Sequence, residues 1–267
     1  MRMTRRLTLV AGFVAVTFGS IHALSAAETL KVGSYPANPP WQFKNEAGEF
    51  EGFEVDIVRE IAKRLGRDID IQGLDFKALF AATASKRVDM VISSLTITPD
   101  RLENQSFTQP YFEGGLGVAV RTDSDITSLA DLNGKKVGSI ATSTPEAWLQ
   151  EHKDEVGYAS YSSFDSTSNM LTALASGRID AAVNDVVGLR YTFTKMDGLR
   201  VADEIVTGEK FAIMMPKNSE LLMQVNDIIS DMKTDGTMAR LYMKWFGVEP
   251  AEGSFTVTPL PVPTLAD

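Results

Sequence analysis

The sequence predicts an α/β protein built from two similar lobes, and three observations support this prediction. The chain has 267 residues, of which 44% are hydrophobic, enough for two lobes of roughly 100 residues each, both with a full-sized core. Short apolar runs alternate with amphipathic helical patterns, as in mostly parallel sheets covered by helices. Residues 84–94 are echoed at 175–185, and both copies run through Arg-(Val/Ile)-Asp into an apolar strand with a polar end. The echo indicates two lobes of the same design.

The individual elements follow from periodicity and from residues that begin or end helices. Val55, Val58 and Ile61 lie on one stripe of a helix that Gly66 ends. Asp75 is expected to cap the helix that leads into the first copy of the echo. The proline-rich segment beyond Val248 is predicted to be extended or disordered. In order, we expect strands at 30–35, 69–71, 88–92, 116–120, 136–141, 179–183 and 210–216, and helices at 52–65, 76–85, 186–195, 219–233 and 237–246.

Polar residues follow the predicted strand at 88–92. Ser93, Ser94 and Thr96 carry hydroxyls, and Arg101 follows a Pro-Asp pair that suits the first turn of a helix. In an open α/β sheet, ligands bind at the carboxyl ends of the strands. Hydroxyls, free amides and one arginine at such a place suit a small carboxylate. The alternative is an ordinary polar loop in which Arg101 pairs with a surface acid.

Two further positions suit a charged ligand. Thr144 or Ser143 can cap a helix whose first turn contains Pro145, and a helix N-terminus with free amides binds anions. The alternative there is an ordinary capped helix. Asp185 follows the apolar strand of the second echo copy, where an unpaired carboxylate is costly to bury. A ligand ammonium would supply its partner, and a capping role for Asp185 on the helix at 186–195 is compatible with this.

Composition excludes several classes of chemistry. The chain has no cysteine, which rules out disulfides and thiolate chemistry, and its two histidines are His22 and His152. One histidine outside the leader argues against a histidine zinc site or a histidine-dependent triad. An all-carboxylate magnesium or calcium site is the alternative that composition leaves open, but no Asp-rich loop has the required spacing, and no cofactor is expected. The formal net charge of −9 becomes −12 without the three leader arginines, which argues against nucleic-acid binding.

The first 27 residues have the pattern of an export signal. Arg2, Arg5 and Arg6 precede an apolar run at 7–21 that is short for a membrane span, and small residues follow at 23–27. Cleavage is expected after Ala27, with Ser25 as the alternative, and both general and twin-arginine export remain open. A single anchor helix is the alternative to cleavage. We therefore expect a soluble periplasmic protein.

Seven motifs, in order and spacing, resemble those of the periplasmic amino-acid-binding proteins that serve ABC importers, the solute-binding proteins of the polar amino-acid type. Each motif is weak alone, and together they cover about residues 30 to 247. They are Gly33 with Pro39-Pro40-Trp41-Gln42-Phe43, Gly52-Phe53-Glu54-Val55-Asp56, Ser94-Leu95-Thr96-Ile97-Thr98-Pro99-Asp100-Arg101, Phe107-Thr108-Gln109-Pro110-Tyr111, Leu132-Asn133-Gly134-Lys135-Lys136-Val137-Gly138, Gly177-Arg178-Ile179-Asp180-Ala181, and Asp235-Gly236-Thr237 with Lys244-Trp245-Phe246-Gly247.

The resemblance implies a type II periplasmic-binding-protein fold. In this fold two α/β lobes are joined by a hinge of two crossover strands, and the ligand is clamped between the lobes. The expected division is a signal peptide at 1–27, a first lobe at 28–115 and 210–247, a second lobe at 116–209, and a proline-rich tail at 248–267.

The resemblance also implies roles for single residues. Arg101 would grip the α-carboxylate of the ligand, and Asp185 would bind its α-ammonium. The implied helpers are the amides of Ser143 and Thr144 at the carboxylate, the Ser94 carbonyl and Thr96 hydroxyl at the ammonium, and Phe76 as an apolar wall. The full predicted set is Tyr35, Asn38, Phe76, Ser93, Ser94, Thr96, Arg101, Ser143, Thr144 and Asp185.

Three departures from the family pattern bear on the ligand. Tyr35 stands where many members have an aspartate, Asn38 where an aromatic is common, and Thr142 where a glycine is usual. Members that bind basic amino acids often rely on that aspartate, so a polar but not strongly basic ligand is expected. The threonine at 142 would alter the anion-binding loop.

The expected function is capture of a free amino acid or close derivative and its delivery to the permease of an ABC transporter. The chain is expected to act as a monomer, without enzymatic activity and without binding nucleic acid. One alternative is a dehydratase-like enzyme on the same scaffold, for which Asp, Glu or Tyr would have to supply acid–base chemistry. Another alternative is a ligand sensor that takes no part in transport.

Overall fold

The computed structural model describes residues 28–266, so the predicted signal peptide lies outside the described residues. None of the helices in this range combines the length and hydropathy that a membrane crossing requires. The elements are β1 (Leu30–Ser34), β2 (Ala37–Asn38), β3 (Gln42–Lys44), β4 (Phe50–Glu51), α1 (Phe53–Leu65), β5 (Ile69–Gly73), α2 (Phe76–Ala84), β6 (Met90–Val91), α3 (Pro99–Asn104), β7 (Gln105–Phe107), β8 (Phe112–Arg121), the 3-10 helix η1 (Leu129–Leu132), β9 (Lys136–Ile140), α4 (Thr144–Glu151), α5 (Lys153–Val156), β10 (Ser160–Phe164), α6 (Thr167–Ala175), β11 (Ala181–Asp185), α7 (Val186–Phe193), β12 (Leu199–Phe211), β13 (Met214–Pro216), α8 (Leu222–Thr234) and α9 (Thr237–Phe246).

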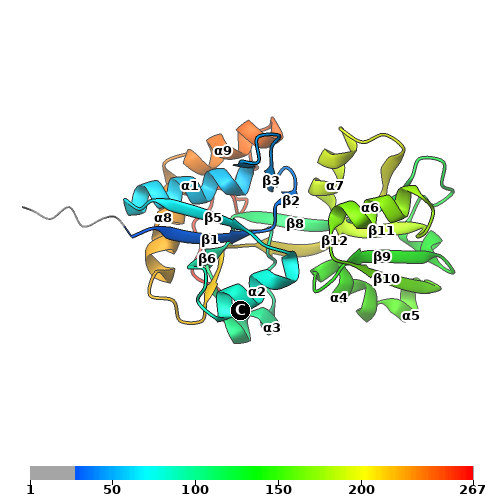
Figure 1. Ribbon diagram of the computed structural model, residues 1–267, viewed down its shortest axis with the longest axis horizontal. Coiled ribbons are helices and arrows are strands. Elements are labelled where there is room, and N and C mark those ends of the chain that lie inside the picture. Colours follow the sequence, from blue (N-terminus) through cyan, green and yellow to red (C-terminus); the bar gives the residue numbers. More distant parts are fainter. Residues whose placement is uncertain (1–27, 267) are drawn as a thin grey trace, which may run out of the picture.

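Two five-stranded sheets form the two lobes, and their strand orders correspond. The first sheet has the order β5-β1-β6-β13-β7 and the second β10-β9-β11-β8-β12. In each sheet the first three strands are parallel and the third pairs antiparallel with the fourth. Helices α1, α8 and α9 cover one face of the first sheet, and α2 and α3 lie on the other side (Figure 1).

The sequence echo occupies equivalent places in the two lobes, as predicted. The Asp89 carboxylate accepts a hydrogen bond from the Lys31 amide at 2.8 Å, and the Asp180 carboxylate accepts one from the Lys136 amide at 2.8 Å. Each aspartate thus ties the start of β6 or β11 to the start of the neighbouring parallel strand. The two polar ends of the echo therefore emerge at corresponding edges of the two sheets.

Strands β8 and β12 run side by side from one lobe to the other (Figure 1). They pair antiparallel from Leu199 opposite Arg121 to Phe211 opposite Phe112, so both connect the lobes as crossover strands. The predicted strand at 210–216 is therefore two elements, since β12 ends at Phe211 and β13 begins at Met214.

The crossover strand β12 contains a bulge. Ile205 lies opposite Leu116 and Glu209 opposite Gly114, so three residues at 206–208 face the single Gly115. Gly208 has a φ of 65°, in the left-handed region that glycine adopts without strain. Bulges of this kind re-aim the side chain that follows them. Here that side chain belongs to Glu209.

Trp41 is the centre of an aromatic cluster in the first lobe. Its side chain is fully buried, and its ring lies 4.6 Å from Phe112, 5.5 Å from Phe211 and 6.1 Å from Phe53, measured between ring centroids. Phe112 and Phe211 are the terminal residues of the paired ends of β8 and β12. The cluster therefore anchors the crossover strands in the first lobe.

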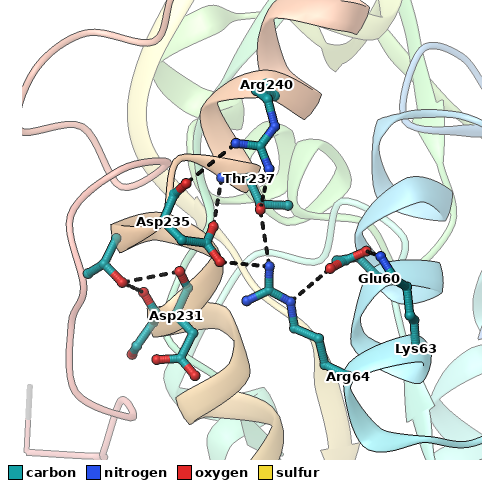
Figure 2. Close-up of polar contacts among 9 residues, drawn as sticks. Glu60, Lys63, Arg64, Asp231, Asp235, Thr237 and Arg240 are labelled. Carbon is teal, nitrogen blue, oxygen red and sulfur yellow. Dashed lines mark hydrogen bonds and ion pairs between the residues drawn. The ribbon is translucent and has the colours of Figure 1, made fainter.

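A polar network joins α1 to the last two helices. The Arg64 guanidinium bonds to Glu60 at 2.9 Å and to Asp235 at 2.8 Å, and it donates to the Thr237 hydroxyl at 3.0 Å. Figure 2 shows Arg240 reaching the same Thr237 hydroxyl from α9. The Asp235-Gly236-Thr237 motif thus turns the chain from α8 into α9 and docks that turn on α1.

Over residues 248–266 the proline-rich tail forms no helix or strand; it turns at 251–258, continues without regular structure, and is packed against the first lobe. The buried Lys233 ammonium donates to Gln109 Oε1 at 2.8 Å, to the Pro110 carbonyl at 2.7 Å and to the tail carbonyl of Thr258 at 3.0 Å. Burial lowers the pKa of Lys233 to about 7. The Thr256 hydroxyl donates to the Tyr111 carbonyl at 3.0 Å. The tail therefore rests on the segment that leads into β8.

Most predicted helix ends are found within a few residues. Gly66 ends α1 with a left-handed φ of 65°, and Asp185 caps α7 by accepting the Gly188 amide at 2.6 Å. Asp75 precedes α2 as expected, but its side chain makes no capping hydrogen bond.

Candidate functional site

A cavity lies between the lobes, and both lobes contribute side chains to it. Concave sites lined by apolar side chains and a few polar groups are where small molecules usually bind. Eight of the ten predicted residues line it: Tyr35, Asn38, Phe76, Ser94, Arg101, Ser143, Thr144 and Asp185. The lining also includes Leu116, Ile140, Pro145, Thr167, Asn184, Glu209 and Phe211.

Asp185 is a nearly buried carboxylate with one satisfied and one free oxygen. Oδ1 accepts the Trp41 indole N–H at 2.8 Å and the Gly188 amide at 2.6 Å. Oδ2 is buried and has no hydrogen-bond partner among the described residues. Burial raises the pKa of Asp185 to about 7, against the lowering effect of its two donors. An unpartnered buried oxygen that lines a cavity suits a cationic ligand group.

Arg101 also lines the cavity, and its side chain contacts both lobes. Its Nη1 donates to the Thr96 carbonyl at 2.8 Å, and Nη2 reaches the Thr142 carbonyl at 3.4 Å. Burial lowers the pKa of Arg101 to about 10, which leaves the guanidinium charged at neutral pH. Within residues 28–266 no acidic side chain forms an ion pair with Arg101. The Arg101 guanidinium therefore keeps N–H donors that can bind a ligand carboxylate.

The N-terminus of α4 also lines the cavity, but one predicted donor there is already used. The Ser143 amide donates to the Ile140 carbonyl at 3.3 Å, and the Ser143 hydroxyl caps the helix by accepting the Glu146 amide. The Ser143 amide therefore already has an acceptor within the chain, and its expected role at a ligand carboxylate stays a prediction. The Thr144 amide has no acceptor among the described residues, so it remains available to an anion.

Thr142 takes a left-handed conformation, which glycine adopts without strain. Its φ is 63°, which is unfavourable for a β-branched residue. The Thr142 amide donates to the Glu146 carboxylate at 2.6 Å. This bond holds the loop in a conformation in which the Thr142 carbonyl accepts from Arg101, and the expected effect of Thr142 on anion binding stays a prediction.

Ser94 is positioned by a buried acid that the sequence analysis did not single out. Its backbone has a φ of 42°, and its amide donates to Glu54 Oε1 at 2.7 Å. The Tyr111 hydroxyl donates to the same oxygen. Among the described residues no group donates to the Ser94 carbonyl. Glu54 thus occupies the Ser94 amide and leaves the carbonyl free for a ligand.

Burial raises the pKa of Glu54 to about 8, above the ordinary value of 4.5. Between about pH 4.5 and about pH 8, the folded protein therefore holds a proton that the unfolded chain has lost. The unfolding free energy of the unliganded protein should fall as pH rises through this window. Denaturant titrations of Glu54→Gln should show a shallower slope, while the exposed-site control Glu46→Gln keeps the wild-type slope. Equal slopes in all three proteins would contradict a neutral buried Glu54.

The other wall of the cavity carries no acidic side chain. The Tyr35 hydroxyl accepts the Thr167 amide of the second lobe at 3.1 Å, and the Tyr35 ring packs edge-on against Phe76. Asn38 donates to the Ser94 hydroxyl at 2.9 Å. This wall is therefore aromatic and neutral polar.

Two predicted residues do not line the cavity. Ser93 is buried, and its hydroxyl accepts the Gln42 side-chain amide at 2.9 Å, so it belongs to the interior of the first lobe. Thr96 is also buried, but its hydroxyl lies 3.4 Å from the Thr144 hydroxyl and donates to Glu209 Oε1 at 2.8 Å. Thr96 therefore contributes to the edge of the site through Glu209.

Glu209 is the functional candidate that sequence reasoning missed. The prediction placed a lobe boundary between residues 209 and 210 and gave Glu209 no role. Its signal was present in Thr207-Gly208, a turn-forming pair directly before an acid and an apolar strand. The bulge places the Glu209 carboxylate 2.8 Å from the Thr96 hydroxyl and within a hydrogen bond of Thr144.

Comparisons with known proteins show which proteins the chain is similar to. The sequence profile of the bacterial extracellular solute-binding proteins, family 3, matches residues 30–248. The chain is 32% identical to the L-cystine-binding protein TcyJ of Escherichia coli (strain K12) over 250 residues, which is 91% of this chain and 93% of that protein. It is 30% identical to ABC transporter arginine-binding protein 1 of the same strain over 248 residues, 91% of this chain and 99% of that one.

Solved structures show the same fold. An ancestral arginine-binding protein bound to arginine superposes with a TM-score of 0.79 at 37% identity, covering 83% of this chain and 100% of that one. An ancestral arginine-binding protein bound to glutamine gives a TM-score of 0.77 at 38% identity, with 82% and 98% coverage. The two-lobed type II architecture is thereby confirmed.

Proposed function

Because this chain belongs to the bacterial extracellular solute-binding proteins of family 3, we propose that it captures one amino acid between its lobes and delivers it to an ABC importer. The family and its relatives are solute-binding proteins and not enzymes. The observation that carries the proposal is the placement of Arg101 and the free oxygen of Asp185 in one cavity. Their opposite charges match the two ends of an amino-acid backbone.

The proposed binding mode uses both lobes. Arg101 and the Thr144 amide take the α-carboxylate, while Asp185 and the Ser94 carbonyl take the α-ammonium. Arg101 and Ser94 belong to the first lobe, and Thr144 and Asp185 belong to the second. A ligand held this way gains all of its contacts only when the lobes are closed, so binding favours closure.

We further propose that the ligand side chain is polar and not strongly basic. Its wall is formed by Tyr35, Asn38, Phe76 and Thr167, with no carboxylate among them. Among the described residues, two acids line the cavity. In the proposed mode Asp185 binds the ligand α-ammonium, and Glu209 accepts from two threonine hydroxyls. The relatives named for arginine and histidine make basic amino acids the main competing class.

The remaining expectations are part of the same proposal. A signal peptide at 1–27 would direct the chain to the periplasm, where a monomer would meet the permease subunits of its importer. The proposed division assigns 28–115 and 210–247 to the first lobe and 116–209 to the second. The periplasmic histidine-binding protein of Salmonella typhimurium, 30% identical over 245 residues, supports this compartment.

A thermal-shift screen over the twenty amino acids tests the proposal. An amino acid at about 100 times its Kd adds roughly 2.7 kcal/mol to stability, or about 5–10 °C in Tm for a protein of this size. We expect a shift of this size with one or a few neutral polar amino acids and little with lysine or arginine. A panel without any shift would contradict amino-acid binding, and a shift with arginine alone would contradict the proposed side-chain class.

A further inference from the structure

Glu209 is a nearly buried acid in the hinge whose chemistry the binding mode above does not use. It is 6% exposed and lines the cavity, although it lies on a crossover strand and not at the end of a core strand. The bulge at 206–208 that precedes it places two extra residues in β12 relative to β8. A bulge beside a site commonly serves to aim one side chain.

The Glu209 carboxylate binds one hydroxyl from each lobe. Oε1 accepts from Thr96 of the first lobe at 2.8 Å and from Thr144 of the second lobe. The two hydroxyl oxygens lie 3.4 Å apart, so the three groups form a compact cluster that bridges the cleft. This cluster exists only when the lobes are close together.

A threonine hydroxyl has one proton to donate and two lone pairs that accept. An ionised carboxylate only accepts, so both hydroxyl protons in the cluster must point at Glu209. The oxygens of Thr96 and Thr144 then present lone pairs to the rest of their surroundings. Such oxygens attract the N–H groups of an ammonium and repel a carboxylate.

We propose that Glu209 is a positioning residue of the binding site: it accepts the hydroxyl protons of Thr96 and Thr144, so that the Thr144 oxygen, which lines the cavity, presents a lone pair to the ligand ammonium, and it joins the two lobes in the closed form. The inference rests on the proposed amino-acid function. In this proposal Glu209, a residue of the hinge, helps the site to recognise the amino group of the ligand. Thr144 accordingly serves the ligand through two different atoms, its amide at the carboxylate and its hydroxyl oxygen at the ammonium.

The variant Glu209→Gln tests this role with little change of shape. A glutamine amide has one accepting oxygen and one donating NH₂, so one threonine hydroxyl can reverse and donate toward the ligand. Affinity for the amino acid with the largest thermal shift should fall about tenfold or more. Affinity for the matching α-hydroxy acid, such as L-lactate for L-alanine, should fall much less, because a hydroxyl oxygen can accept the reversed hydrogen bond.

The decisive measurement is the ratio of the two dissociation constants by calorimetry, hydroxy acid over amino acid. This ratio should drop about tenfold in Glu209→Gln and stay at the wild-type value in Glu204→Gln, a control on the same strand whose side chain pairs with Arg190. If Glu209→Gln folds poorly, Thr144→Val removes one of the two hydroxyls and should lower the ratio in the same direction.

A purely structural role would weaken both ligands equally and leave the ratio unchanged, which would overturn the inference while leaving the proposed function in place. If the wild-type chain binds no amino acid at all, the proposed function fails and the inference falls with it. The two failures are therefore distinguishable in one set of titrations.

Discussion

Replacing Asp185 by asparagine is expected to lower amino-acid affinity by roughly 30-fold to several thousand-fold, the equivalent of about 2–5 kcal/mol. The substitution keeps the shape and leaves one oxygen to accept from Trp41 and Gly188. It removes the negative charge and places a donor or a neutral oxygen where the ammonium would sit. Calorimetry against the amino acid from the thermal screen measures the loss.

The pH dependence of this loss identifies its cause. Burial raises the pKa of Asp185 to about 7, and an ammonium needs the ionised form. Wild-type affinity should therefore fall about tenfold for each pH unit below about 7, with a proton released on binding. Asp185→Asn should show a flat profile through this range, and the exposed-site control Asp197→Asn should follow the wild type. A wild-type profile without this slope would show that Asp185 does not face the ammonium.

Arg101→Ala is expected to have an effect of similar size, about 2–5 kcal/mol, because it leaves a buried ligand carboxylate without its cation. Arg101→Lys should recover only part of the affinity, since lysine has the charge but not the planar fork. Amino acids whose α-carboxylate is replaced by an amide test whether Arg101 binds that carboxylate. Wild type should strongly prefer the free acid over its amide, and Arg101→Ala should lose this preference.

The control for this experiment is Arg87→Ala, an exposed arginine of the same lobe. It should bind like the wild type. Thermal unfolding without ligand must accompany the titrations, because Arg101 also contacts the Thr96 and Thr142 carbonyls. Retained preference for the free acid in a folded Arg101→Ala protein would place the carboxylate elsewhere.

The sequence predicted the features that depend on local pattern or on repetition. The apolar stripe of α1 predicted that helix, and Gly66 predicted its end. The echo predicted that Ser94 and Asp185 lie at the polar ends of corresponding strands. The structure brings both into one cavity. These predictions succeeded because periodicity and repeated motifs reflect contacts between residues that are near one another in the sequence.

The missed features depend on contacts between distant segments. The Trp41 indole meets Asp185 across 144 positions, which no local pattern reveals. Glu209 enters the site only because β12 bulges opposite Gly115. The tail was taken as extended or disordered because prolines suppress periodicity, yet the Lys233 ammonium and backbone carbonyls bind it to the first lobe.

Because Trp41 contacts Asp185, the fluorescence of Trp41 should depend on whether the two lobes are closed. Trp41 is fully buried, and its indole N–H is bonded across the cleft. Opening the lobes would break that bond and change the polarity around the ring, on which indole emission depends. The other two of the three tryptophans, Trp148 and Trp245, lie partly exposed on the outer helices α4 and α9 and would supply a steady background. Intrinsic fluorescence would then follow the closing of the lobes in real time, without any attached dye.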